Sequence, residues 1–288
     1  MSVNVIYTGS SGNSYSLKTT GLKIKEANYH NYEWTPDTTE RQFGVTVNRF
    51  KKAPIAYQTT LMFTGPYEAN KALLEALHAD FERDIISNTP GTLTWGECYI
   101  KTFVRSSSTF PDEDTNLFTR NVVEFYCPYP FWIAEKSVSI TPLNMEVLED
   151  RDKGYSYEYW YKYAQNQTVT TIQTSANYYS DCDFRMTAYG PFSSLYVTIS
   201  GQIYNISFAA DAAEYIVIDT RKKGLYKGQA YLVRNNGDIV NVFDYRNPNY
   251  ELFKKVPAGT IVINYPRTYG IDLTFYMERS EPIQEVTP

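Results

Sequence analysis

Short runs of alternating apolar and polar residues dominate the first half of the chain, a pattern typical of β-strands with one buried face. Such runs lie at Leu22–Lys25, Val45–Val47 and Ala56–Phe63, and again at Leu93–Val104 and Leu117–Tyr126. Their β-branched and aromatic residues favour extended structure. The first half is therefore predicted to be β-rich.

One segment, 67–87, departs from this alternation. Its apolar residues recur every three or four positions and charged residues fill much of the remainder, which is the period of an amphipathic helix. Turn-forming sequences precede it at 64–66 and follow it at 88–91. We predict a helix over 67–87 with an apolar face formed by Leu73, Ala76, Leu77, Phe81 and Ile85.

The stretch EFYCPYPFWIAE, residues 124–135, closes the first half. A strand over Val122–Tyr126 has to stop at Pro128, because proline has no N–H to donate to a neighbouring strand. Pro130 keeps the backbone extended, which leaves the aromatic run 131–133 able to dock on another surface. The pattern predicts a domain boundary here.

The second half is read as one short strand after another, separated by turn sequences and without a helix. Such a series at roughly ten-residue spacing is typical of a β-sandwich. Segment 137–154 is mixed in pattern and is predicted to be a linker. The ribbon YSYEYWYKY, 155–163, is either an exposed strand that another surface covers or an ordinary edge strand. The predicted strands are Phe184–Ala188, Leu195–Ile199, Gln202–Phe208, Tyr215–Asp219, Gln229–Val233, Leu252–Lys254, Thr260–Tyr265 and Ile271–Met277. The fold class is mainly β with one helix.

Composition adds one unusual feature, because the chain of 288 residues contains 27 tyrosines. Tyrosine favours strands and also protein interfaces, so the composition suits a β-rich protein that assembles. The net charge of -5 argues against nucleic acid as the main partner. No run of about 18 apolar residues is present for a membrane span. The N-terminus lacks a secretion signal, so the chain is expected to fold in the cell that makes it.

No motif assigns a metal or cofactor. Cys98, Cys127 and Cys182 form no CxxC pair, so buried free thiols are expected in place of a zinc site or a disulfide. The acidic run 112–114 lacks the spacing of a calcium loop and is predicted to be solvated. The basic run 221–223 is likewise predicted to be a solvated turn.

Catalytic histidine chemistry finds no support in the sequence. His30 and His78 have no GxSxG elbow nearby. The Gly- and Ser-rich loop 8–14 lacks the GK[ST] ending of a phosphate-binding loop, so a flexible turn is expected. His78 is expected to be a partly exposed helical residue.

A glycosidase needs only two carboxylates that face each other, and the second half contains many. Nothing in the spacing selects a pair, so no catalytic residue is assigned. The candidates are Asp181, Asp183, Asp211, Glu214, Asp219 and Asp244.

Five strings follow one another in the second half: GYSYEYWYKY, DFRMTAYGPFSSLYVTISGQIYNI, AEYIVIDTRKKGLY, NGDIVNVFDYRNPNYELFKKVPAGT and DLTFYMERSEP. The first half contains the helix-bearing segment, ISNTPGTLTWGECYIKTF and VVEFYCPYPFW. Together these strings resemble the distal tail protein (Dit) family of long-tailed bacteriophages. The resemblance extends over nearly the whole chain.

The resemblance implies a structural protein without catalytic activity. Residues 1–136 would form a β-rich ring domain with one helix, six copies of which make a homohexameric ring that continues the tail tube. Residues 137–154 would be a linker and 155–288 a galectin-like β-sandwich. The implied partners are the major tail protein of the tube, the tail-associated hub protein (Tal) and attached receptor-binding proteins, with nucleic acid only as the passing genome and no membrane. The implied location is the distal end of the virion tail, with synthesis in the host bacterial cytoplasm.

Two other functions remain open. A carbohydrate-binding adhesin would stack a cell-wall sugar on Trp132, Trp160 or an exposed tyrosine. The intervals between predicted strands are too short to hold the inserted sugar-binding module that some relatives carry. A tail-associated hydrolase would need one of the unpaired carboxylates.

Overall fold

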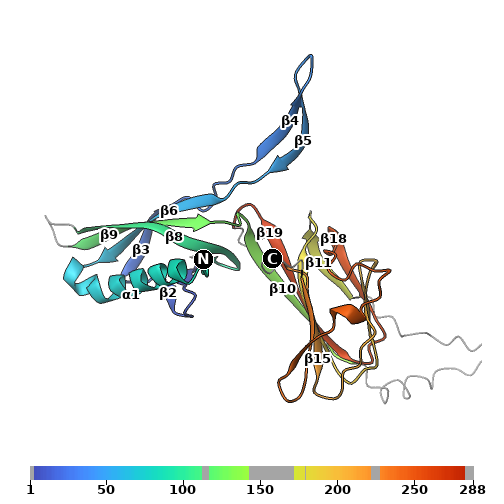
Figure 1. Cartoon of the computed structure of the whole chain (residues 1–288). Helices are drawn as coiled ribbons and strands as arrows, with labels where there is room; N and C mark the ends of the chain where they lie inside the picture. Colours follow the sequence, from blue (N-terminus) through green and yellow to red (C-terminus); the bar gives the residue numbers. More distant parts are fainter. Residues whose placement is uncertain (1–2, 112–116, 143–171, 179, 222–227, 283–288) are drawn as a thin grey trace, which may run out of the picture. The chain divides into compact units, whose positions relative to one another are not determined.

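The computed structural model describes residues 3–111, 117–142, 172–178, 180–221 and 228–282. The chain divides into two compact units (Figure 1). Unit 1 consists of Met1–Ala134 with Glu278–Pro288, and unit 2 of Glu135–Met277. Strands β10 (Trp132–Ile140) and β19 (Gly270–Arg279) have residues in both units.

Unit 1 is built around one long strand, β8 (Cys98–Pro111). The first part of β8 pairs with β7 and β10, and its second part pairs with β9, so β8 is shared by two groups of strands. The strand orders are β10-β8-β7-β1-β2 and β8-β9-β6-β3. The remaining bounds are β1 (Val5–Thr8), β2 (Ser14–Ser16), β3 (Leu22–Ala27), β6 (Ile55–Thr64), β7 (Gly91–Trp95) and β9 (Phe118–Cys127).

The helix α1 (Tyr67–Ile86) packs on β8 and β9, and its bounds confirm the prediction over 67–87. It begins after Pro66 and ends before Asn88, which adopts φ of 50°, the left-handed conformation common just past helix ends. The predicted buried face is wrong in part. Leu73 and Ile85 are 41% and 49% exposed, and Ala76 is exposed as well. The buried positions are Leu74, Leu77, Asp80, Phe81 and Asp84, so two aspartates point inward.

A separate two-stranded sheet extends unit 1. Strands β4 (Thr35–Glu40) and β5 (Val45–Lys51) pair only with each other, and the hairpin stands away from the other strands of the unit (Figure 1). An isolated two-stranded hairpin is marginally stable in water. The β4–β5 hairpin therefore depends on contacts beyond its own ladder.

The core of unit 1 uses tyrosine as a core residue. Tyr7, Tyr29 and Tyr57 are at most 1% exposed. Trp132, also fully buried, donates its indole N–H to the Tyr57 hydroxyl at 3.2 Å, and Thr59 donates to the Tyr29 hydroxyl at 2.7 Å. Part of the tyrosine excess therefore serves the interior, where each hydroxyl has a hydrogen-bond partner, and assembly is not its only cause.

Unit 2 consists of two antiparallel sheets. Their strand orders are β17-β16-β15-β12-β19-β10 and β11-β18-β13-β14. Phe184 of β12 and Tyr204 of β14 have ring centroids 4.8 Å apart, so the sheets pack face to face as a sandwich. The bounds are β11 (Ile172–Tyr178), β12 (Asp183–Tyr189), β13 (Leu195–Ile199), β14 (Gln202–Ile206), β15 (Tyr215–Asp219), β16 (Gln229–Val233), β17 (Ile239–Asn241) and β18 (Gly259–Asn264), with a 3₁₀ turn at Phe243–Tyr245.

The mainly β fold class with one α-helix is confirmed for the described residues. Three details differ from the sequence prediction. The strand character over 93–104 is a β7–β8 hairpin that turns at Gly96, Leu252–Lys254 is no strand, and the linker predicted at 137–154 begins inside β10. The strands β1, β2, β4, β10, β11 and β17 were not predicted. The ribbon 155–163 and most of the predicted linker lie outside the described residues.

No helix in the described ranges is long and apolar enough to cross a membrane.

Candidate assembly surfaces

Four of the six carboxylates considered for glycosidase chemistry make structural contacts. Asp219 accepts two hydrogen bonds from the Arg221 guanidinium, at 3.0 and 2.7 Å, and Asp183 pairs with Lys255 at 3.0 Å. Glu214 accepts a hydrogen bond from the Asp211 N–H, and Asp181 accepts one from the Ala258 N–H. Asp244 is exposed. These contacts cap turns and strand ends in unit 2, and the structure selects no facing pair from the six.

The other sequence candidates also have structural roles. Cys98, Cys127 and Cys182 are all buried. His78 lies 3.0 Å from the Ser107 hydroxyl, so it ties α1 to β8, and burial lowers the pKa of its imidazole. His30 lies 3.6 Å from Glu281. The acidic run 112–114 and two residues of the basic run, Lys222 and Lys223, are outside the described residues.

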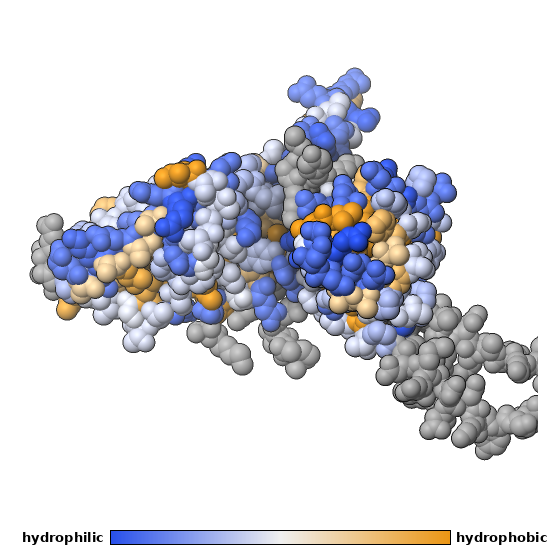
Figure 2. Space-filling model, turned by 60° about the horizontal axis from the view of Figure 1, so that its bottom comes forward, coloured by the Kyte–Doolittle hydropathy of each residue, from blue (hydrophilic) through white to orange (hydrophobic). Residues whose placement is uncertain are grey.

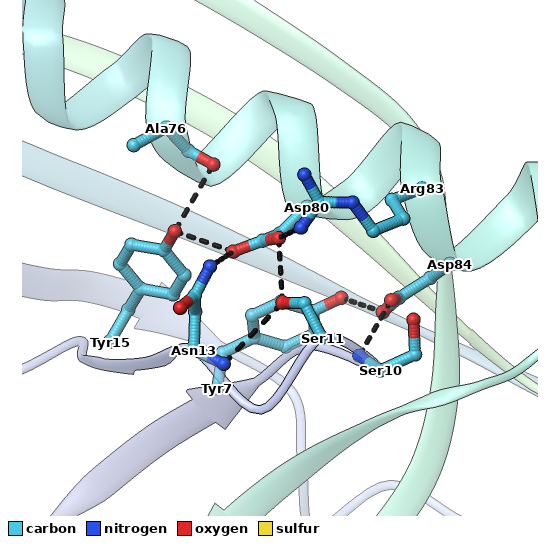
Figure 3. Close-up of polar contacts among 9 residues, drawn as sticks. All are labelled: Tyr7, Ser10, Ser11, Asn13, Tyr15, Ala76, Asp80, Arg83 and Asp84. Carbon is cyan, nitrogen blue, oxygen red and sulfur yellow. Dashed lines mark hydrogen bonds and ion pairs between the residues drawn. The ribbon is translucent and has the colours of Figure 1, made fainter.

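The loop between β1 and β2 is fastened to α1 by the two inward aspartates (Figure 3). Asp80 accepts hydrogen bonds from the Ser11 hydroxyl at 2.9 Å, the Asn13 amide at 3.0 Å and the Tyr15 hydroxyl at 2.6 Å. Arg83 on the same helix adds an ion pair at 2.6 Å. The loop 8–14, predicted to be a flexible turn, is therefore an anchored element; we name Tyr7, Ser10, Ser11, Asn13, Tyr15, Asp80 and Asp84 the loop anchor.

Asp84 completes the loop anchor one helical turn further on. It accepts hydrogen bonds from the Tyr7 hydroxyl and, at 2.7 Å, from the Ser10 backbone N–H. Gly91 leaves room for this pair, because a Cβ there would lie 2.7 Å from the Tyr7 hydroxyl oxygen. Burial and the neighbouring Asp84 carboxylate raise the pKa of Tyr7, so the phenol stays a donor.

The same contacts determine the charge state of Asp80. Burial by itself raises the pKa of this carboxyl, but the hydrogen bonds from Tyr15, Asn13 and Ser11 and the charge of Arg83 outweigh burial and hold the pKa below its ordinary value of 3.8. Burial together with the Asp80 contact raises the pKa of Tyr15 to about 12. Asp80 is therefore an ionised carboxylate held by three neutral donors of the loop anchor and by the positive charge of Arg83.

The β4–β5 hairpin carries the densest set of exposed apolar side chains in unit 1. Phe43 at its tip is 87% exposed, and Val45, Val47 and Phe50 on β5 are 59%, 46% and 58% exposed. Exposed apolar patches of several hundred Å² mark interaction sites in soluble proteins. We name Pro36, Phe43, Val45, Val47 and Phe50 the hairpin patch.

The base of the hairpin is packed against aromatic rings. The Lys52 ammonium lies 4.5 Å from the ring centroid of Phe131 and 5.6 Å from those of Tyr32 and Trp34. It also donates to the Ser280 carbonyl at 3.5 Å. Because Tyr32 and Trp34 precede β4 and Lys52 follows β5, these contacts join the two legs of the hairpin.

A second apolar group lies at the far end of the β6–β9 pair. Phe110, Leu117 and Phe118 are 47%, 65% and 38% exposed, and the Arg120 guanidinium lies 4.8 Å above the Phe110 ring. We name Phe110, Leu117, Phe118 and Arg120 the strand-end patch. Elsewhere unit 1 is mostly polar with separate apolar spots, as Figure 2 shows for the face it presents. No sequence signal singled out either patch, since exposure of a strand residue depends on its neighbours.

No protein-family model and no curated protein matches the sequence. Solved structures match it along nearly its whole length. The SPP1 Dit protein, described as a paradigm of the hub adsorption apparatus in phages that infect Gram-positive bacteria, has a TM-score of 0.61 at 8% identity. That match covers 97% of this chain and 100% of SPP1 Dit. The chain has the Dit fold.

Two phage P2 baseplate structures in the activated conformation agree with this Dit fold. The chain matched in the structure with Ca has a TM-score of 0.62 at 13% identity, and the match covers 98% of this chain and 100% of that one. The structure with Sr gives 0.62 at 12% identity with the same coverage. The resemblance seen in the sequence is confirmed at the level of the fold, across both units.

Proposed function

We propose that the chain is a structural hub protein of a phage tail tip, which joins the tail tube to the baseplate and carries host-adsorption proteins. The observation that carries the proposal is the match of both units to Dit and baseplate chains over their full length. A partial match would support only a shared domain. The structural contacts of four of the six candidate carboxylates in unit 2 favour a scaffold over a hydrolase.

The finer proposal is a homohexameric ring. The ring-forming domain, predicted at 1–136, would lie in unit 1. The galectin-like sandwich, predicted at 155–288, would extend from the ring. Subunits of such a ring meet through two different surfaces of the same chain. The two exposed patches of unit 1 support this arrangement. The major tail protein and Tal would bind its two faces at the distal end of the virion tail, and receptor-binding proteins would attach at its periphery.

Negative-stain imaging of the purified full chain, together with light scattering, tests the ring. We expect an annulus with six-fold symmetry and peripheral lobes, and a mass of six copies. A mass that stays at one copy up to the highest accessible protein concentration would contradict the proposal. The presence of the chain at the tail tip is tested by antibody labelling of intact particles.

The alternative function is a carbohydrate-binding adhesin. Trp132 cannot stack on a sugar, because it is 0% exposed. Trp160 lies outside the described residues. Exposed tyrosines such as Tyr245, at 50%, remain available in unit 2. On a glycan array we expect no saccharide-specific binding by the full chain, and tight binding abolished by Tyr245→Ala would favour the adhesin.

A further inference from the structure

The β4–β5 hairpin has one apolar face and one polar face. In an antiparallel pair, side chains of directly opposed residues lie on the same face, and faces alternate along each strand. Pro36 opposes Phe50, Thr38 opposes Val47 and Glu40 opposes Val45. These three pairs share one face, which holds four of the five residues of the hairpin patch.

The opposite face is polar, and its side chains form hydrogen bonds and ion pairs with one another. Asp37 accepts from Arg49 at 2.9 Å and pairs with Lys51 at 3.1 Å, and the Asn48 amide donates to the Thr39 hydroxyl at 2.8 Å. Asn48 is the extra residue of a β-bulge, which keeps Phe50 in register with Val47 on the apolar face. The hairpin therefore has internal partners on one side and an uncovered apolar surface on the other.

The hairpin patch is large enough to form a substantial part of an interface. Its exposed area is on the order of 400 Å², taking roughly 200 Å² for a whole aromatic side chain. That is about half of what one partner contributes to a standard protein interface, roughly 800 Å². The packed base at Lys52 limits the entropy that docking would cost.

A matching surface exists on the same chain but out of reach of its own hairpin. The hairpin leads into the N-terminal end of β6, whereas Phe118 pairs with Thr64 at the other end of that ten-residue strand. At about 3.3 Å per residue the two ends lie roughly 30 Å apart. The charges also match, because Glu40 lies on the apolar face of the hairpin and Arg120 lies beside Phe110.

From these observations we propose that the hairpin patch of one copy docks on the strand-end patch of a second copy of this chain. Each copy then offers a hairpin at one end and a receiving surface at the other, a head-to-tail contact that closes into a ring when the rotation permits. Glu40 of one copy would pair with Arg120 of the next. The inference rests on the proposed self-assembly and assigns its contact residues.

A double variant, Val47→Cys with Leu117→Cys, tests the contact directly. Under mild oxidation we expect a ladder of disulfide-linked multimers on a non-reducing denaturing gel, because each contact links consecutive copies. The native Cys98, Cys127 and Cys182 are buried and do not compete. The matched control is Thr46→Cys with Leu117→Cys, since Thr46 lies on the polar face. A ladder no stronger than that of the control would overturn the inference.

A second measurement avoids dependence on disulfide geometry. Val47→Ser with Phe50→Ser should weaken self-association roughly 100-fold by light scattering, through loss of two buried apolar side chains. Thr39→Ala with Thr46→Ala, on the polar face, should leave it within about threefold. Circular dichroism checks that both variants fold. Equal assembly by the two variants would contradict the docking.

The outcomes separate this inference from the proposed ring. A six-copy annulus without the ladder would leave the ring standing and remove the proposed contact between the hairpin patch and the strand-end patch. A ladder without a closed annulus would keep the contact and remove the ring. A monomeric wild type without the ladder would remove both.

Discussion

The Tyr15 hydroxyl donates a 2.6 Å hydrogen bond to the Asp80 carboxylate, which lies 65 positions later in the chain. This contact joins β2 to the inward face of α1, at a helix position where amphipathic spacing would place an apolar residue. Burial of an ionised carboxylate is costly unless it is paired and hydrogen-bonded. The loop anchor meets that requirement with three donors and an arginine.

Replacement of Asp80 by alanine should therefore destabilise unit 1. The variant loses four polar contacts, removes the acceptor of the Asn13 amide and leaves the Tyr15 hydroxyl with the Ala76 carbonyl alone, at 3.2 Å. We expect the free energy of unfolding to fall by about 2–4 kcal/mol, measured by urea titration. Glu75→Ala on the exposed side of the same helix is the control and should change it by less than about 0.5 kcal/mol. Similar losses in both variants would contradict the role assigned to Asp80.

Acid sensitivity follows from the lowered pKa of Asp80. A carboxyl whose pKa is lower in the folded state than in the unfolded state contributes stability that is present above the unfolded pKa, about 3.9, and is lost as pH falls through the folded pKa. Below a pH of about 4 the wild type should lose stability faster than Asp80→Asn. Urea titrations over a pH series give the free energy of unfolding of each protein. The contributions of the other acidic groups cancel in the difference between the two. Parallel curves would mean that Asp80 titrates normally.

Gly91 gives an independent test of the packing in the loop anchor. An alanine Cβ at this position would collide with the Tyr7 hydroxyl and the Asp84 carboxylate, so Gly91→Ala should cost about 1–3 kcal/mol. Gly21→Ala is the control, because nothing lies within 4 Å of a Cβ built there. Thermal unfolding of both variants checks the prediction. A melting temperature of Gly91→Ala equal to that of the wild type would contradict it.

The periodic elements were predictable from local sequence, but the loop anchor was not. The bounds of α1 and most strands of unit 2 follow from spacing and turn residues alone. The apolar face predicted for α1 does not include Asp80 or Asp84, because a helical aspartate is usually solvated, and the donors that hold these two side chains inside lie 65 to 77 positions away. Their side chains are brought to α1 only by the tertiary fold. No short window of sequence contains both partners.

The β7–β8 hairpin carried a local signal that was missed. Trp95 pairs with Cys98, which leaves Gly96 and Glu97 as a two-residue turn, and Gly96 has φ of 59°. Glycine in the first position is the mark of a type II′ hairpin turn. The exposure of the hairpin patch, by contrast, was not predictable. The alternation of apolar and polar residues predicts a strand with one apolar face, but it does not show whether another part of the protein covers that face.

The final prediction separates two contributions of Lys52 to the stability of the hairpin base, its charge and its aliphatic stem. Burial lowers the pKa of its ammonium to about 8, so the folded environment as a whole disfavours the charge even though three rings surround it. Cation–π attraction at partly exposed sites is worth only about 0.5–1 kcal/mol. We therefore expect the aliphatic stem of Lys52 to hold the hairpin base more than its charge does.

Lys52→Met keeps the stem and removes the charge, so we expect its free energy of unfolding at pH 7 to equal or exceed that of the wild type. Lys52→Ala removes both and should lose about 1–2 kcal/mol, with faster amide hydrogen exchange over β4 and β5. A pKa that is lower in the folded state makes stability rise as pH increases through that pKa. Between pH 7 and about 9.5 the free energy of unfolding of the wild type should therefore increase relative to that of Lys52→Met. A large loss in Lys52→Met at pH 7 would instead show that the charge holds the hairpin.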